Sequence, residues 1–197
     1  LQHVVFDNNK SFGGTGLDRG GIAYGALSIF FSSVTIEDAI FTDNLAQAGS
    51  SMGSGISGYL FAHALGGAIS IENAIYDDNQ NPFPSCTIIL RRITITGNQI
   101  RGGNATTFAG GAFGAGIVIE YTSSFTLSDS SISNNTAIAG NAQTGGNACG
   151  GAICAADNSQ LTFERLKVIN NSAIGGNGIS GGNAGPGAGG GIYIFAT

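Results

Sequence analysis

Short runs of alternating apolar and polar residues recur along the chain at a nearly constant interval. The stretch from Ile117 to Asn141 aligns without a gap with the stretch from Ile153 to Asn177, at an offset of 36 residues. Weaker copies come earlier, since Asn98 precedes Asn135 by 37 residues and Asn44 precedes Asn98 by 54. Self-similarity at a period of roughly 20 to 50 residues is typical of solenoids and other repeat architectures.

Each copy contains three runs whose period of two predicts a β-strand with one buried face. The first run follows a glycine pair, the second has the pattern apolar–x–apolar, and the third ends three residues before an asparagine. Because such strands are too short to bury a face alone, they must stack on their equivalents in neighbouring copies. The sequence therefore predicts an all-β solenoid with three short strands per coil of about 36 residues and with loop insertions. One expected inward column consists of Val34, Ile88, Phe125 and Leu161.

Asparagines and glycines recur at the expected corners of this stack. Asparagine tolerates the left-handed backbone of a sharp corner, and its amide can pair with the equivalent amides above and below. The predicted asparagine ladder consists of Asn44, Asn98, Asn135 and Asn171. Glycine pairs are expected where positive φ and close approach of coils exclude a Cβ. These corner glycines are Gly66, Gly67, Gly150, Gly151, Gly189 and Gly190.

A column of charged residues supports the same register. The repeat offsets align Asp38, Arg92, Asp129 and Arg165, so that the sign of the charge alternates on consecutive coils. Opposite charges stacked in this way attract each other, whereas like charges would repel.

The composition is rich in glycine and poor in charge. Glycine accounts for 34 of the 197 residues, well above the share of about 7% in ordinary globular chains. Charged residues make up 10% of the chain, against about 25% in such chains. Since glycine within a helix is destabilising, this composition favours strands and turns over helices. The Gly-Gly-Asn runs at 102–104, 145–147, 175–177 and 181–183 are interpreted as turns on one edge or as flexible loops.

The net charge of −5 and the absence of a basic run argue against a nucleic-acid partner. The longest apolar stretch, 58–71, is interrupted by His63 and two glycines, so we expect no membrane-spanning segment here. No motif of a cofactor site is found, and no cofactor is expected.

Residues 1–197 are expected to form a single solenoid segment. Both ends of the sequence fall inside a repeat, which predicts an excerpt of a longer chain or a unit that stacks end to end with other copies. Residues 74–86 lengthen the second copy and contain Asn81-Pro82-Phe83-Pro84, which is typical of an inserted surface loop.

The repeats resemble those of the chlamydial polymorphic outer membrane proteins, which carry many copies of the tetrapeptides GGA[ILV] and FxxN. The segments 66–69 and 150–153 match the first tetrapeptide, and 6–9 and 41–44 match the second. Similar repeats also occur in surface proteins of some algae and protists. The resemblance implies a right-handed parallel β-helix that is displayed at a cell surface and serves in adhesion.

Catalytic and metal sites have few candidates. Asp77 and Asp78 form an acidic pair in the inserted loop, which we interpret as solvated rather than as a catalytic or calcium site. The segment 13–18 fits the opening of a calcium-binding nonapeptide, but the next nine residues do not repeat it. His3 and His63 lack metal-ligand spacing. We therefore predict neither a catalytic nor a metal-binding residue.

Two covalent modifications are suggested by the sequence. Cys149 and Cys154 flank a Gly-Gly corner and can form a disulfide only if the chain folds back there. Asn104, Asn134 and Asn170 begin N-glycosylation triplets, and Asn134 and Asn170 should point outward if the next residue of each points inward.

The sequence predicts a non-catalytic, structural or adhesive segment of an extracellular or cell-surface protein, an adhesin stalk or a fibre component. The expected partners are other copies of the chain or the rest of a longer one, surface glycans and host receptors. The alternative is a polysaccharide lyase or glycoside hydrolase on the same scaffold. An ice-binding solenoid is a weaker third class, because the column Thr35, Ile89, Thr126 and Thr162 is interrupted and one residue wide.

Overall fold

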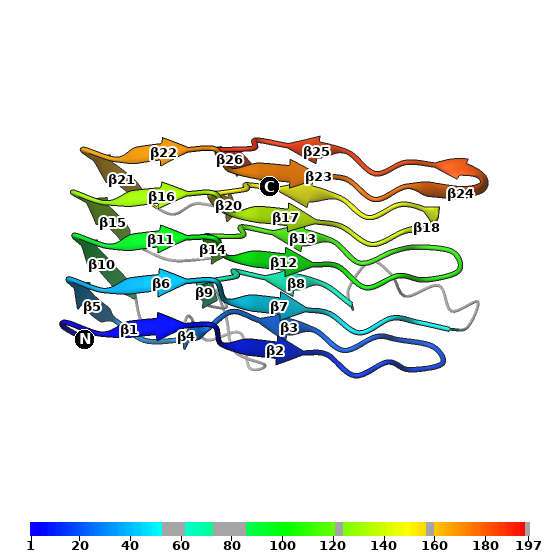
Figure 1. Cartoon of the computed structure of the whole chain (residues 1–197), viewed down its shortest axis with the longest axis horizontal. Coiled ribbons are helices and arrows are strands. Elements are labelled where there is room, and N and C mark those ends of the chain that lie inside the picture. Colours follow the sequence, from blue (N-terminus) through cyan, green and yellow to red (C-terminus); the bar gives the residue numbers. More distant parts are fainter. Residues whose placement is uncertain (53–61, 73–85, 121–123, 157–159, 196–197) are drawn as a thin grey trace, which may run out of the picture.

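The computed structural model describes residues 1–52, 62–72, 86–120, 124–156 and 160–195, and every regular element in these residues is a β-strand. The chain winds repeatedly through the same positions, so that equivalent strands of successive coils lie one above the other from the N-terminus to the C-terminal coil (Figure 1). All described strand pairs are parallel, and they form six sheets among the described residues. The all-β, parallel, repeating architecture is confirmed and is consistent with a solenoid.

Three sheets form the body of the molecule. Sheet I contains β1 (Val5–Asp7), β6 (Ile40–Thr42), β11 (Thr94–Thr96), β16 (Ser131–Ser133) and β22 (Lys167–Ile169). Sheet IV contains β4 (Leu27–Phe30), β9 (Ile69–Glu72), β14 (Ile117–Glu120), β20 (Ile153–Ala156) and β26 (Ile192–Phe195). Sheet V contains β5 (Val34–Glu37), β10 (Thr87–Arg91), β15 (Ser124–Ser128) and β21 (Gln160–Glu164).

The remaining sheets form a thinner extension. Sheet II contains β2 (Lys10–Phe12), β7 (Leu45–Gln47), β12 (Gln99–Arg101), β17 (Thr136–Ile138) and β23 (Ser172–Ile174). Sheet III contains β3 (Ala23–Tyr24), β8 (Ala64–Leu65), β13 (Ala112–Phe113), β19 (Ala148–Cys149) and β25 (Gly187–Ala188). Sheet VI contains β18 (Ala142–Thr144) and β24 (Gly178–Asn183).

The register follows the repeat offsets read from the sequence. Ile117 pairs with Ile153 in sheet IV, and Ile95 pairs with both Phe41 and Ile132 in sheet I. The column Val34, Ile88, Phe125 and Leu161 also pairs as expected. Residues 36, 37 or 54 positions apart are therefore vertical neighbours, at the usual strand spacing of about 4.8 Å.

The prediction of three strands per coil is wrong, because every complete coil in the described part of the chain passes through sheets I to V, and two of these coils also pass through sheet VI. The first, second and third predicted runs form the strands of sheets IV, V and I, respectively. Sheets II and III were missed because their strands have two or three residues, of which only one points inward, and that residue is small in most coils, as with Ala46 and Ala137. Such strands carry no visible alternation of apolar and polar residues. Residues 74–85 of the predicted insertion lie outside the described residues.

A core of large aliphatic and aromatic side chains lies between sheets I, IV and V. Its fully buried members include Phe41, Ile95 and Phe125, each with no exposed surface. Phe6 of the first coil stacks on Phe41 with ring centroids 4.6 Å apart. Each such side chain contributes about 1.5 to 3 kcal/mol on burial, so this body carries most of the hydrophobic stabilisation.

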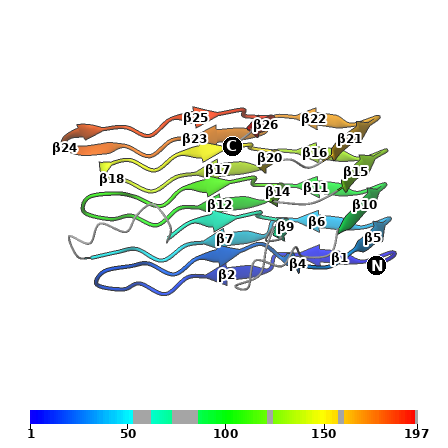
Figure 2. The same ribbon diagram turned by 180° about the vertical axis from the view of Figure 1, so that it is seen from behind.

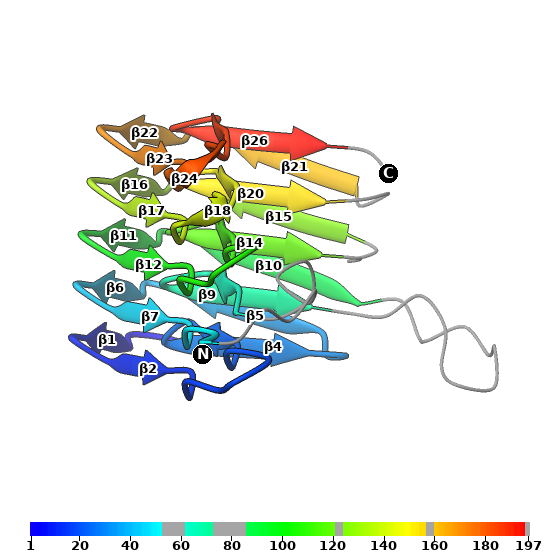
Figure 3. The same ribbon diagram turned by 90° about the vertical axis from the view of Figure 1, so that its right-hand side faces the viewer.

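Sheets II and III enclose a second core that consists almost entirely of alanine, with Ile100 as its single large member. Beyond them, the segments that lead from sheet II to sheet III (residues 13–22, 48–52, 102–111, 139–147 and 175–186) form an arm that extends from the body (Figure 2). We call these segments the glycine arm. Figure 3 shows the stack from the arm's end, with sheets I and II on one side and sheet IV on the other.

The glycine arm is held together by backbone hydrogen bonds that zigzag between its outgoing and returning segments. The amide of Gly110 donates to the carbonyl of Gly103 over 2.8 Å, and Gly140 in the next coil donates to Gly110 over 2.9 Å. Gly146 donates to Gly140 over 3.0 Å, and Gly176 to Gly146 over 2.9 Å. The Gly-Gly-Asn runs are therefore hydrogen-bonded segments of this arm, and the interpretation as turns on one edge is wrong.

Candidate functional site

The four predicted ladder asparagines form one column at the junction between sheets I and II. The side-chain Nδ2 of Asn44 donates to Oδ1 of Asn98 over 2.8 Å, Asn98 donates to Asn135 over 2.9 Å, and Asn135 to Asn171 over 2.9 Å. The backbone amide of each of these three donor residues donates to the same oxygen as its side chain does. Asn9 extends the column below Asn44. The column ties every pair of adjacent coils together.

The expectation that these asparagines themselves adopt the left-handed backbone is wrong. The positive φ angles belong to the residue before each ladder position, with Asp43 at 52°, Gly97 at 69°, Asn134 at 57° and Asn170 at 54°. The preceding residue adopts the left-handed backbone conformation at the corner. The ladder side chain that follows therefore points inward, where its amide is shielded from water. A sequence pattern of Asn-Asn leaves open which of the two asparagines makes the corner.

The three glycosylation candidates are all exposed. Asn134 and Asn170 point outward next to inward-facing ladder residues. Asn104 is exposed on the glycine arm and accepts a hydrogen bond from the backbone amide of Asn141 at 2.8 Å. Asn141 accepts one in turn from Asn177 at 2.7 Å. This second, exposed asparagine column was missed, although its members align in the repeat.

The corner glycines lie between sheets III and IV. Gly66, Gly150 and Gly189 have φ angles of 57°, 62° and 57°. A Cβ on Gly67 or Gly151 would collide with the backbone carbonyl of the next coil, whereas Gly190 has somewhat more room, since its nearest neighbour would lie 3.1 Å away. The tight corner folds the chain back far enough for Cys149 and Cys154 to form a disulfide, with Cα atoms 5.8 Å apart.

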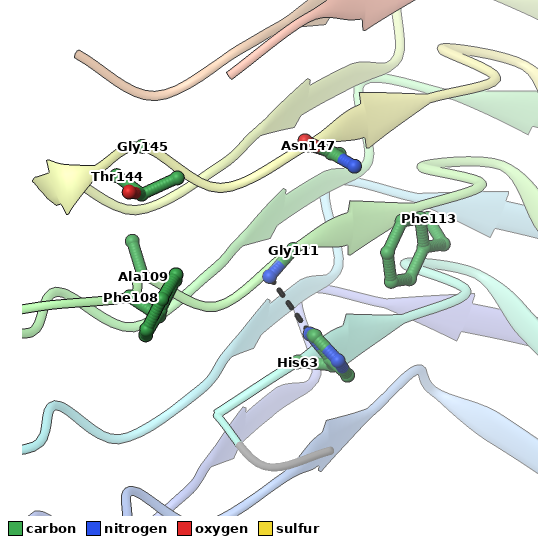
Figure 4. A pocket seen from close by; sticks show the side chains of 8 residues that line it. All are labelled: His63, Phe108, Ala109, Gly111, Phe113, Thr144, Gly145 and Asn147. Atoms are coloured by element: carbon green, nitrogen blue, oxygen red, sulfur yellow. Dashed lines mark hydrogen bonds between the residues drawn. The ribbon is translucent and has the colours of Figure 1, made fainter. Parts of the chain in front are cut away.

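The folded-back corner creates a concave surface between the outer faces of sheets III and IV, which we call the corner groove. Its floor is a small apolar cluster of Leu65, Val118 and the disulfide, with Tyr24, Phe113 and Phe195 packed against it. Two hollows open here, the first over sheet III and the adjoining glycine arm and the second over sheets III and IV. One has a volume of about 280 Å³ and is bordered by His63, Phe108, Phe113, Thr144 and Asn147 (Figure 4). The other, of about 220 Å³, is bordered by Phe113, Asn147, Pro186, Tyr193 and Phe195.

The position of His63 is fixed by two contacts. Its Nδ1 accepts a hydrogen bond from the backbone amide of Gly111 over 2.8 Å (Figure 4). Its ring meets that of Phe113 edge-on, with centroids 5.2 Å apart. Within the described residues no group of three or more His, Cys, Asp or Glu side chains could hold a metal ion.

Two carboxylates lie on adjacent strands of sheet IV, on its outer face. Glu72 and Glu120 are direct register partners. Burial, followed by the negative charges of these two carboxylates, raises the pKa of the Tyr24 phenol. Burial raises the pKa of Glu72, and a hydrogen bond from Ser70 opposes this shift. Sequence reasoning missed the pair, although the first strand of two successive copies ends in glutamate.

The other candidate residues lie apart from this surface. Arg92 donates two hydrogen bonds to Asp38, at 2.6 and 2.9 Å, and Arg165 pairs in the same way with Asp129. These hydrogen bonds lower the pKa of both aspartates. His3 lies 4.0 Å from Asp38. Asp77 and Asp78 lie outside the described residues.

No protein-family model, curated protein or solved structure matches the chain. Among the described residues, no helix has the length and apolar character needed to cross a membrane.

Proposed function

We propose that the chain is a structural and adhesive segment of a secreted or cell-surface protein of the polymorphic outer membrane protein-like type, folded as a right-handed parallel β-helix. The observation that carries the proposal is the asparagine ladder, which joins each coil to the next through buried side-chain hydrogen bonds. A column of this kind makes a stiff rod, as a stalk requires. Crossover connections between parallel strands are almost always right-handed, which supports the proposed hand.

Two features support an extracellular location. Disulfides form and persist in oxidising compartments, and Cys149 and Cys154 are joined. Asn134 and Asn170 are exposed acceptor sites, in register one coil apart. In this proposal the partners are further copies or the remainder of a longer chain, which continue the stack, together with surface glycans or receptors.

Bead attachment tests the adhesive role. Beads coated with the purified chain should attach to cultured epithelial cells or to each other. Beads coated with an Asn98→Ala/Asn135→Ala variant, whose coils lack the ladder, should attach several-fold less. If both bead preparations attach no better than beads coated with serum albumin, the adhesive proposal is wrong.

A carbohydrate-active enzyme is the second candidate, and the pairing of Glu72 with Glu120 favours it. Glycoside hydrolysis uses two carboxyl groups, and one of them needs a raised pKa to act as the acid, as burial provides for Glu72. The purified chain should be incubated with polysaccharides and new reducing ends measured. Cleavage that disappears in both Glu72→Gln and Glu120→Gln would establish the enzyme and overturn the non-catalytic proposal.

A further inference from the structure

The two hollows of the corner groove are neighbours. Phe113 and Asn147 border both of them. The bordering residues come from four successive coils, with His63 next to β8, Phe113 in β13, Asn147 next to β19 and Pro186 next to β25. At about 4.8 Å per coil the groove extends roughly 15 Å along the stack, which is the length of a few sugar rings.

The residues that border the hollows combine aromatic rings with uncharged polar groups. Phe113, Tyr193 and Phe195 offer ring faces or edges, and the rings of Tyr193 and Phe195 lie 5.7 Å apart. Asn147 is exposed, and its amide both donates and accepts hydrogen bonds. Thr144 adds a hydroxyl, and none of the described residues bordering either hollow carries an Asp, Glu, Lys or Arg charge.

This chemistry matches an uncharged saccharide chain. The C–H faces of a pyranose ring pack on aromatic side chains, and its hydroxyls pair with amides and hydroxyls, which both donate and accept. An anionic ligand would find no Lys or Arg among the described residues that border the hollows, so its charge would stay unpaired there. A polymer with a repeat close to the coil spacing can also make the same contact on successive coils.

The groove is built on rigid elements. Its floor contains the Cys149–Cys154 disulfide, and both cysteines are buried. Gly111 holds His63 in place, and Asn147 is the last residue of its glycine-arm segment, with its carbonyl accepting a hydrogen bond from the Ala112 amide at 3.0 Å. A preformed surface of this kind loses little conformational entropy when a ligand binds.

We propose that the corner groove binds a neutral polysaccharide chain along the stacking axis, with Phe113 and Tyr193 as stacking platforms and Asn147 as the central hydrogen-bonding residue. This inference rests on the proposed adhesive function and names its ligand class. The bound chain is held and is not cleaved, so Asn147 and the aromatic residues act in recognition alone.

The test is titration of the isotope-labelled chain with four neutral hexasaccharides, cellohexaose, chitohexaose, laminarihexaose and maltohexaose, followed by NMR. Oligogalacturonate, a proline-rich peptide and an asialo N-glycan serve as comparison ligands. The variants are Asn147→Ala and Tyr193→Ala, both at exposed positions, together with Phe113→Ala. Phe12→Ala is the matched control, because Phe12 is 64% exposed on the outer face of sheet II, away from the groove.

We expect at least one neutral hexasaccharide to bind with shifts confined to the groove. Its affinity should fall at least tenfold in Asn147→Ala and Tyr193→Ala, with unchanged melting temperatures, and remain unchanged in Phe12→Ala. The inference is overturned if none of the four binds at millimolar concentration, if the groove variants bind as well as the parent, or if the charged sugar, the peptide or the N-glycan binds more tightly. These results are independent of bead attachment, so either proposal can fail alone.

Discussion

The body and the glycine arm share one stacking register, but different parts of the chain stabilise them. In the body, large side chains such as Phe41 and Phe125 fill the space between three sheets. In the arm, the outgoing and returning segments lie so close that glycine and buried alanine alternate with backbone atoms between them, and amide–carbonyl hydrogen bonds join the segments. The comparison shows that a single solenoid can require large residues on one side and exclude all but the smallest side chains on the other.

The largest effect is expected from adding a side chain to the arm. A Cβ on Gly140 would collide with the carbonyl oxygen of Gly103 one coil away, and neither backbone can move without breaking the zigzag. Gly140→Val should therefore cost about 5 kcal/mol or more of the free energy of unfolding, a size reserved for the most disruptive substitutions. Chemical denaturation measures this cost.

Gly14 in the same arm provides the matched control, because a Cβ there would meet nothing within 4 Å. Gly14→Ala should change the free energy of unfolding by less than about 0.5 kcal/mol. Equal destabilisation by Gly140→Val and Gly14→Ala would contradict the close packing of the arm.

The next largest effect is expected from removing a side chain in the body. Phe125 is completely buried and lies edge-on to Phe163, with ring centroids 6.1 Å apart. Phe125→Ala should cost about 3 to 5 kcal/mol, because it combines lost burial with a cavity. Val5, on the outer face of sheet I and 63% exposed, serves as the control. If Val5→Ala costs as much as Phe125→Ala, the core does not lie where we place it.

An intermediate effect is expected at the junction of body and arm. The Asn98 side chain accepts two hydrogen bonds from Asn44 and donates to Asn135 and to the carbonyl of Phe41. Asn98→Ala leaves buried partners unsatisfied and should cost about 3 kcal/mol. Asn134→Gly is the control, because Asn134 is exposed and glycine adopts its φ of 57° without strain. If Asn98→Ala lowers the free energy of unfolding by less than Asn134→Gly does, the ladder does not stabilise the fold.

The body could be predicted from the sequence more completely than the arm. The strands of sheets I, IV and V can be recognised in the sequence by runs in which every second residue is apolar. The offsets of 36, 37 and 54 residues predict their register. Sheets II and III carry mostly small residues inside, with Ile100 as the exception, so their strands resemble loops. The zigzag of the arm is made by backbone groups, which every residue has, and glycine content alone does not reveal their partners.

The corner groove could not be predicted for a similar reason. Tyr24, Phe113 and Phe195 belong to different coils and to two sheets, and one of those sheets was not expected. Their proximity depends on the fold-back at Gly150 and its equivalents. Glu72 and Glu120 were within reach of the sequence, because both end the first strand of a copy, but the long second copy separates them by 48 positions instead of 36.

The smallest effect is expected from the ion pairs at the corner between sheets V and I, on the body and away from the arm. Hydrogen bonds from Arg92 and Arg165 lower the pKa of Asp38 and Asp129 in the folded state. The unfolded chain therefore takes up these protons first, at about pH 4, the ordinary range of an aspartate. The resulting stabilisation is present above that pH and disappears as the pH falls through the lower folded pKa values.

The Asp38→Asn/Asp129→Asn variant should accordingly lose less stability than the parent between pH 7 and pH 2, and the difference at pH 7 should shrink in molar salt. The pKa of Glu72 is raised in the folded state, so this residue changes the dependence of stability on pH in the opposite direction. Since variant and parent both contain Glu72, its effect cancels in the difference between their stabilities. Gly14→Ala leaves every charge in place, so the stability of this variant should change with pH in the same way as that of the parent. A variant whose stability falls as steeply with acid as that of the parent would show that the alternating charges set the register without stabilising the stack.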